Sequence, residues 1–267
     1  MKFWRRSRGA NAATESNMDL PILYEDSDVV VVNKPAGLVV HSDGRTKEPA
    51  VTDWVLEHYP EAREVGETLK LTSGEIIPRP GIVHRLDRET SGVLLIAKNQ
   101  DAFLFLKKQF QGRQTKKVYN AFVCGKVKAD QGIIDRPIAR SKNDFRKWTA
   151  MRGRQGRERG AVTEYKTLSR FAEGGEGFSF LEVNPKTGRT HQIRVHLKSI
   201  NHPVVCDKLY APKRECALGF GRTALHARSL EFTAQSGKRI TVEAPHPDDF
   251  KEAIKLSQSG VKIGREY

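Results

Sequence analysis

The chain has 267 residues, of which 38% are hydrophobic, enough to bury a core in one large domain or two small ones. Lys and Arg number 46 against 32 Asp and Glu, and the formal net charge of +14 is typical of proteins that bind polyanions. Nucleic acid is therefore the leading partner class, with a merely basic soluble enzyme as the alternative. The longest apolar run, Val29 to Val32, is too short to cross a bilayer, so we expect no membrane contact.

The cysteines and the N-terminus indicate the compartment. Cys124, Cys206 and Cys216 form no C-x-x-C pair and no zinc-ligand spacing, so we expect neither a disulfide framework nor a metal site. Residues 1–20 begin with Arg and Lys, but the stretch from Gly9 to Asn17 is small and polar where a signal peptide would be apolar. We therefore expect a disordered basic tail over 1–20 and a cytoplasmic protein.

Strands and turns dominate the first part of the chain. The β-rich runs at 22–24 and 29–32 are separated by a turn, and a short helix is expected over 52–58. Residues 60–80 are loop-like, and 81–97 should form a strand, a loop and a buried strand. A helix over 100–110 follows, with Asn99 as its N-cap.

In the second part, alternating patterns predict strands at 117–123, 162–168 and 178–183, a helix at 190–199, a hairpin from 225–233 and 238–243, and a last helix at 248–257. Strands outnumber helices without βαβ alternation, which predicts the α+β class with an antiparallel or mixed sheet. We expect one domain over 21–257 and a tail over 258–267. No glycine-rich nucleotide loop is present in the sequence.

The stretch from Arg140 to Arg159 is the most basic part of the chain. It carries eight Lys or Arg residues against only Asp144 and Glu158, with Phe145 and Trp148 interleaved. Clustered cations neutralise phosphates and aromatic rings stack on exposed bases, so this stretch is the best candidate for binding nucleic acid. A solvated charged loop is the ordinary alternative. We single out Arg140, Arg146 and Lys147 as candidate nucleic-acid contacts.

Asp87 lies between Arg85 and Arg88, where positive charge should keep its carboxylate ionised. An ionised carboxylate suits a nucleophile better than a proton donor. On spacing alone, an ion pair within a loop is the commoner explanation for such a residue. No Ser, His and Asp arrangement typical of a hydrolase is evident.

Three motifs nevertheless carry a resemblance. The segment His84-Arg85-Leu86-Asp87-Arg88-Glu89-Thr90-Ser91-Gly92 closely resembles the active-site motif of the RluA family of pseudouridine synthases. The runs 117–125 and 187–197 are similar to its second and third motifs, in the same order. Shorter landmarks at 33–37, 202–204 and 225–227 extend the match from about Pro21 to Phe250.

The resemblance implies a pseudouridine synthase fold, a mixed and largely antiparallel sheet with helices and loops around a central RNA-binding cleft. It implies an isomerase that acts on structured RNA, ribosomal or transfer, without a cofactor and as a monomer. Asp87 resembles the nucleophile, Tyr119 the tyrosine that packs on the target base, and Arg194 the basic partner of the aspartate. Arg85 is similar to the arginine that fills the space left by a flipped nucleotide. Further substrate contacts are expected from Arg88, Lys117, Arg189, His191 and Gln192.

The chain departs from the family pattern at two places. The family usually has glycine where Cys206 and Ala211 stand, which concerns the shape of a loop more than activity. Many relatives also carry an S4-type RNA-binding domain, and the residues before Pro21 are too few for one. The alternatives are a non-catalytic RNA-binding or ribosome-assembly factor with this fold and, more weakly, a metal-dependent nuclease, for which no carboxylate cluster is evident.

Overall fold

One large sheet organises the molecule. The computed structural model describes residues 18–42, 48–70, 74 and 76–259. Within these residues, nine strands form a sheet in which β14 (Arg239–Glu243) pairs with β13 and the remaining eight follow a single path. That path runs β1 (Ile22–Glu25), β2 (Val29–Lys34), β5 (Ser91–Ala97), β13 (Leu225–Thr233), β6 (Lys116–Cys124), β12 (Glu176–Pro185), β11 (Val162–Glu173) and β7 (Gln131–Asp135).

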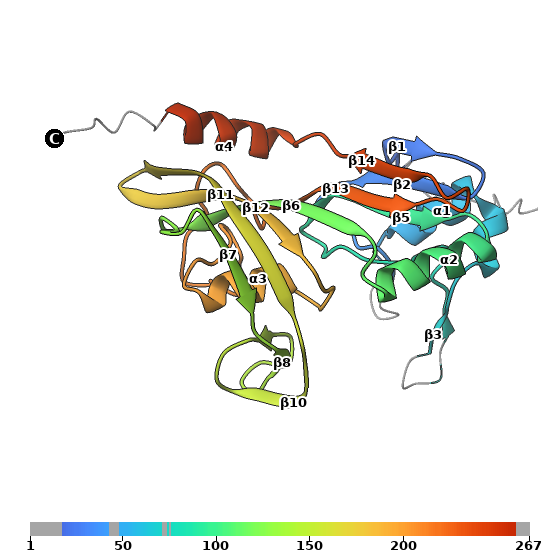
Figure 1. Cartoon of the computed structure of the whole chain (residues 1–267), viewed down its shortest axis with the longest axis horizontal. Coiled ribbons are helices and arrows are strands. Elements are labelled where there is room, and N and C mark those ends of the chain that lie inside the picture. Colours follow the sequence, from blue (N-terminus) through green and yellow to red (C-terminus); the bar gives the residue numbers. More distant parts are fainter. Residues whose placement is uncertain (1–17, 43–47, 71–73, 75, 260–267) are drawn as a thin grey trace, which may run out of the picture.

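Four α-helices of the described chain lie against the sheet: α1 (Val51–His58), α2 (Gln100–Gln111), α3 (Gln192–Ser199) and α4 (Asp248–Ser259). In Figure 1, α2 and α3 lie on one side of the sheet and α4 lies on the opposite side. The Asn99 side chain accepts a hydrogen bond from the Ala102 amide at 2.9 Å and caps α2 as predicted. The strand pairs of the large sheet are antiparallel except β5 with β13. The predicted α+β class with a largely antiparallel sheet is confirmed.

The parallel contact between β5 and β13 depends on a glycine. Gly92 pairs with Ala227, and a Cβ atom at Gly92 would lie 2.1 Å from the Ala227 carbonyl oxygen. Gly92 also has φ +112°, a conformation that L side chains rarely adopt. Ala227 pairs on its other side with Tyr119 of β6. The register therefore brings the start of β5, and the loop that precedes it, next to Tyr119.

Two hydrophobic cores flank this junction. One combines β1, β2 and β5 with α1 and α2 around Trp54 and Leu94, and it includes Leu20, one residue before the predicted start of the domain. The other combines β6 and β12 with α3 and α4 around Phe122 and Phe250. Tyr119 packs against both cores, so it lies where the two halves of the molecule meet.

Two segments differ from the loops expected of them. Residues 60–80 contain a 3₁₀ helix, η1 (Pro60–Glu64), and the short strands β3 (Leu69–Lys70) and β4 (Ile76–Ile77). The basic stretch folds into a separate three-stranded sheet of β8 (Ile138–Ser141), β9 (Trp148–Thr149) and β10 (Arg154–Arg159), here called the basic insert. Figure 1 shows β8 and β10 extending from the ends of β7 and β11. The charged residues hide these strands in the sequence, because the insert contributes only Ile138 and Ala150 to the small core beneath it, with Trp148 packed against that core.

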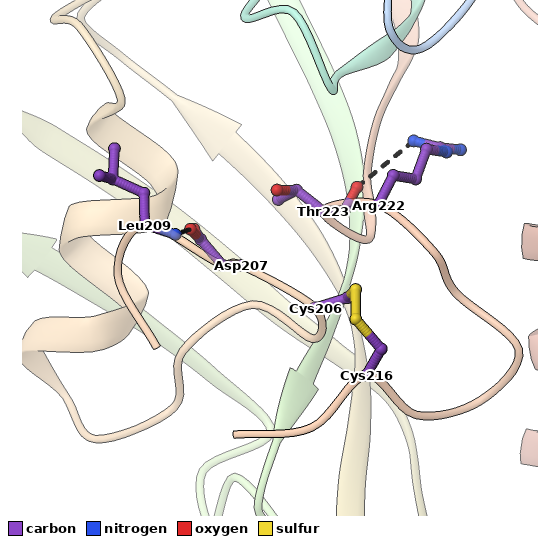
Figure 2. Close-up of a disulfide and its surroundings, with 6 residues drawn as sticks. All are labelled: Cys206, Asp207, Leu209, Cys216, Arg222 and Thr223. Carbon is purple, nitrogen blue, oxygen red and sulfur yellow. Dashed lines mark hydrogen bonds between the residues drawn. A yellow bond between two sulfur atoms is a disulfide. The ribbon is translucent and has the colours of Figure 1, made fainter. Parts of the chain in front are cut away.

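The expectation of no disulfide is wrong. Cys206 and Cys216 are bonded, with their Cα atoms 4.4 Å apart, and Figure 2 shows the bond closing the loop next to Asp207. Spacing in the sequence did not reveal the pair because the backbone between them turns back on itself. Cys124 is a free, buried cysteine.

The predicted tails fall mostly outside the described residues, which end at Ser259 and begin at Met18. Among the helices described, none combines the length and apolar character needed to span a membrane.

Candidate active site

A cavity of about 500 Å³ opens where the two halves of the molecule meet. Its walls come from the loop before β5, from β6, from α3 and from the turn between β12 and α3. Six lining residues are Lys or Arg, against the single carboxylate of Asp87. The cavity brings together eight of the residues singled out from the sequence: Arg85, Asp87, Lys117, Tyr119, Arg189, His191, Gln192 and Arg194.

The loop that carries Asp87 is held from below by a buried lysine. Lys34, at the end of β2, donates to the carbonyl oxygens of Arg88 at 3.0 Å and Leu38 at 2.7 Å. The Gly37 amide donates to the same Arg88 oxygen at 2.9 Å. Burial lowers the pKa of Lys34 to about 7, although the negative charge of Asp87 partly opposes this shift. The turn at 34–38 therefore holds the loop through the Arg88 carbonyl oxygen, independently of the contacts that the side chains of the loop make.

Arg194 joins two aspartates that are far apart in sequence. Its Nη1 donates to Asp87 Oδ2 at 3.0 Å, so the ion pair expected between these residues is present. Its Nε and Nη2 donate to the two carboxylate oxygens of Asp207 at 2.7 and 2.9 Å, a bidentate arrangement. Burial alone would lower the pKa of Arg194, but the hydrogen bonds and charge of Asp207, followed by those of Asp87, raise it above its ordinary value.

Asp207 is the site residue that the sequence did not reveal. Its side chain is 1% exposed, and its Oδ1 also accepts hydrogen bonds from the amides of Leu209 at 3.1 Å and Tyr210 at 3.0 Å. Figure 2 shows the contact with Leu209 beside the disulfide of Cys206. The only signal in the sequence is the position of Asp207 shortly after the landmark at 202–204. Neighbouring residues do not indicate which arginine pairs with a given carboxylate. Asp207 fixes the guanidinium that contacts Asp87.

The immediate sequence neighbours of Asp87 do not neutralise it. Arg85 Nη1 lies 3.2 Å from His41 Nε2, and Arg88 forms an ion pair of 2.5 Å with Glu48. The cation that pairs with Asp87 is Arg194 of α3, which lies 107 residues away in the sequence. The expectation that the flanking arginines keep Asp87 ionised is therefore replaced by this long-range ion pair. No donor among the described residues lies within hydrogen-bond distance of Asp87 Oδ1, and His191 Nε2 is 3.9 Å from it.

Tyr119 and Lys117 face the cavity from β6. Burial, and then the charge of Asp87, raises the pKa of Tyr119, so its phenol stays protonated at neutral pH. Burial also lowers the pKa of Lys117. A neutral aromatic ring and a partly desolvated cation therefore lie side by side on the cavity wall, a surface suited to a base and its phosphate.

The residues before and at the start of α3 shape the opposite wall. His191 has φ +53°, and its Nδ1 lies 2.8 Å from the hydroxyl of Tyr210. Burial lowers the pKa of His191, so its ring is neutral near pH 7. The side-chain amide of Gln192 is hydrogen-bonded within the protein. Its oxygen accepts from the Thr187 hydroxyl at 2.6 Å, and its nitrogen donates to the Val162 carbonyl oxygen at 3.0 Å. Gln192 thus holds the turn, while Arg189 lines the cavity.

Four predicted RNA contacts lie outside this cavity: Arg88, Arg140, Arg146 and Lys147. Arg140 covers the ring of Trp148 at 4.6 Å and donates to the Phe145 carbonyl oxygen at 2.6 Å. Arg146 forms a bidentate pair with Asp144 at 3.0 and 2.9 Å. The structure therefore separates these residues of the basic insert from the Asp87 cavity.

Residues 28–199 match the family described as RNA pseudouridylate synthase. The chain belongs to this family, in its RluA-type branch. It is 40% identical over 247 residues to the ribosomal large subunit pseudouridine synthase D of Borreliella burgdorferi, covering 92% of this chain and 71% of that one. A Bacillus subtilis protein named uncharacterized RNA pseudouridine synthase YlyB is 38% identical over 239 residues, covering 89% of this chain and 73% of that one.

Solved structures agree with the family assignment. Human RNA pseudouridylate synthase domain containing 1 superposes with a TM-score of 0.68 at 26% identity, covering 86% of this chain and 84% of that one. Human RNA pseudouridylate synthase domain containing 4 superposes with a TM-score of 0.66 at 25% identity, covering 89% of this chain and 92% of that one. The chain is accordingly an RNA-modifying isomerase with the pseudouridine synthase fold.

Proposed function

We propose that this synthase isomerises uridines of large-subunit ribosomal RNA after flipping the target nucleotide into the Asp87 cavity, with Asp87 as the nucleophile. The observation that carries the proposal is the single carboxylate of the cavity, held by buried Arg194 and facing Tyr119. The names of the Borreliella burgdorferi and Neisseria meningitidis relatives favour ribosomal over transfer RNA. Isomerisation consumes no redox equivalent, so the proposed reaction requires no redox cofactor.

The geometry suits an extruded base. A uridine inside a helix hides its reactive atoms, so the enzyme must take the nucleotide out of the stack and supply new contacts. Tyr119 offers a stacking surface within reach of the carboxylate, and Arg85 lies at the exposed rim, where it can occupy the gap left in the RNA. Arg194 binds Oδ2 of Asp87, and Oδ1 accepts no hydrogen bond from the described residues, so Oδ1 is the oxygen available for the reaction.

Tritium release from RNA labelled at carbon 5 of uracil tests the reaction, because isomerisation exchanges that hydrogen and binding alone does not. The wild-type protein should release tritium from ribosomal RNA transcripts, and Asp87→Asn should reduce release by on the order of 10³-fold or more. The isosteric change should leave RNA binding within a few fold. Asp101→Asn, an exposed carboxylate on α2, is the matched control and should behave as wild type.

Three results would overturn all or part of the proposal. Turnover of Asp87→Asn within tenfold of wild type would remove Asp87 as nucleophile. Sequencing of pseudouridines in total RNA from cells with and without the gene identifies the substrate, and sites lost only from transfer RNA would replace the ribosomal assignment. Binding of RNA without tritium release from any RNA would favour the non-catalytic RNA-binding factor.

A further inference from the structure

A second cavity, of about 490 Å³, lies between the basic insert and α3. The insert contributes Lys147, Trp148 and Arg152, and α3 contributes Val195 and Lys198. The cavity exists because the insert packs on the helix through a small core of Ile138, Ala150, Ala161, Val195 and Tyr210. A fixed hollow is therefore present where the sequence indicated only a charged loop.

The lining of this second cavity is cationic. Arg136, Lys147, Arg152 and Lys198 line it, and no carboxylate does. Lys147 lies 3.4 Å from Asp144, whereas Lys198 has no carboxylate within 4 Å among the described residues. Burial lowers the pKa of Lys198, and the charge of Lys147 lowers it further. Two like charges thus converge on the hollow, and an anion between them would relieve their repulsion.

Aromatic and hydroxyl groups complete the lining. Tyr210 is 3% exposed, and its hydroxyl accepts a hydrogen bond from the Trp148 amide at 3.1 Å. Arg140 covers one side of the Trp148 ring, and Trp148 is among the residues that line the cavity. Ser141 and Thr149 add two hydroxyl groups. Proteins bind single-stranded nucleic acid with this combination, because cations contact the phosphates and aromatic rings stack on the bases.

One layer of side chains separates this cavity from the Asp87 cavity. Tyr210 lines the second cavity, and its hydroxyl contacts Nδ1 of His191 in the first at 2.8 Å. The guanidinium of Arg194 lies 5.0 Å from the centre of the Tyr210 ring. A strand that places one nucleotide beside Asp87 can therefore place a neighbouring nucleotide beside Lys198.

We propose that the second cavity is an RNA subsite that binds the phosphate and base of a nucleotide near the flipped uridine. Lys147 and Lys198 bind the phosphate, and Trp148 contacts the base. The RNA nature of this ligand rests on the proposed function, but its occupancy is measured by binding and does not require turnover.

The test compares two double variants that each remove two charges. Lys147→Met/Lys198→Met changes the cavity, and Lys251→Met/Lys255→Met changes exposed lysines of α4 on the opposite side of the sheet. Binding of a uridine-containing RNA stem-loop is measured over a range of salt concentrations, and thermal unfolding confirms that both variants fold. The cavity variant should bind about tenfold more weakly, and its salt slope should fall by about 0.7 to 0.9, the value for one lost phosphate contact.

Tritium release separates this proposal from the function it rests on. Single-turnover release by the cavity variant should reach half of its maximal rate at about tenfold higher enzyme concentration than release by the wild type, because the variant binds RNA more weakly. Affinity and salt slope equal to those of the α4 variant would overturn the subsite, even if the wild-type enzyme is fully active. A large loss of single-turnover rate with unchanged binding would also overturn it, because the two lysines would then support catalysis and not bind RNA. Absence of wild-type release from every RNA would instead remove the proposed function.

Discussion

The Asp87 cavity and the basic insert handle charge in opposite ways. In the cavity wall, the Arg194 side chain is 9% exposed and contacts two carboxylates. In the insert, Arg152, Arg157 and Arg159 are exposed and have no carboxylate within 4 Å among the described residues. A buried charge must be paired because desolvation is costly, whereas an exposed charge can remain available to a polyanion. Removing a charge in the cavity should therefore lower stability, whereas removing a charge in the insert should weaken salt-dependent binding.

The largest effect on stability is expected at Arg194. Arg194→Ala leaves Asp207 buried without a counter-charge, and the loss should be about 3 to 5 kcal/mol of unfolding free energy. Arg194→Lys keeps the charge but not the planar fork, so it should fold better than the alanine variant and retain partial activity. Chemical denaturation and tritium release measure the two effects.

A double-mutant cycle identifies the structural partner of Arg194. Asp207 is 1% exposed and Asp87 is 21% exposed at the side chain. Asp207→Asn should therefore offset most of the loss from Arg194→Ala, with a coupling of about 2 to 3 kcal/mol, and Asp87→Asn should offset less than about 1. Equal coupling to both aspartates would show that Asp87 stabilises the fold as much as Asp207 does, and would weaken the proposal that Asp87 is the nucleophile.

A smaller effect is expected from a neutral histidine that contacts Ser91, next to the loop that carries Asp87. His226 is fully buried, its Nδ1 lies 2.9 Å from the Ser91 hydroxyl, and burial lowers its pKa to about 4. Between pH 6.5 and 4 the unfolded chain binds a proton that the folded chain does not, so stability should fall as the pH falls. The loss approaches about 3 kcal/mol near pH 4.

Denaturation measured from pH 7 to pH 4 checks this expectation. His226→Gln should flatten the dependence, while His58→Gln, at an exposed histidine of α1, should not. If the His226 variant shows the same dependence of stability on pH as the wild type, other groups cause that dependence.

The disulfide should contribute somewhat less than the buried ion pair. It joins cysteines 10 residues apart in a loop that contains Asp207 and Tyr210. Restricting such a loop in the unfolded chain stabilises a protein by about 2 to 3 kcal/mol. Cys216→Ser should lose this amount under oxidising conditions, and the wild-type protein in excess thiol should match the variant. Equal stability of oxidised and reduced wild type would show that the ion pair alone holds the loop.

Sequence patterns predicted local elements well and contacts poorly. The helix capped by Asn99 and the hairpin of β13 and β14 follow from short-range signals. The resemblance to the family motifs singled out Asp87, Tyr119 and Arg194 as candidate site residues. The disulfide, Asp207 and the second cavity depend on segments that meet only in the folded chain. The strands of the basic insert were missed because exposed charge outweighs their few apolar positions. Local chemistry can be derived from sequence, whereas the partner of a charge depends on topology.

The smallest effect on stability, and the sharpest on binding, is expected at the outer arginines of the insert. Replacing Arg152, Arg154, Arg157 and Arg159 with Gln should change unfolding free energy by less than about 0.5 kcal/mol. Three of these side chains are exposed, and the half-buried Arg154 forms a single ion pair, with Glu158 at 3.0 Å. Each lost phosphate contact should reduce the salt slope by about 0.7 to 0.9, so the combined change should be roughly 3 if all four bind RNA.

Removal of four exposed lysines elsewhere provides the control for this last variant, since it lowers the net charge equally. Lys126, Lys128, Lys251 and Lys255 lie outside both cavities, and their replacement with Gln should leave the salt slope nearly unchanged. The arginine variant should also weaken binding to unrelated RNAs alike, because phosphate contacts carry no sequence information. If both variants shift the slope equally, net charge and not the insert governs binding, and the contrast between the two regions would hold for stability alone.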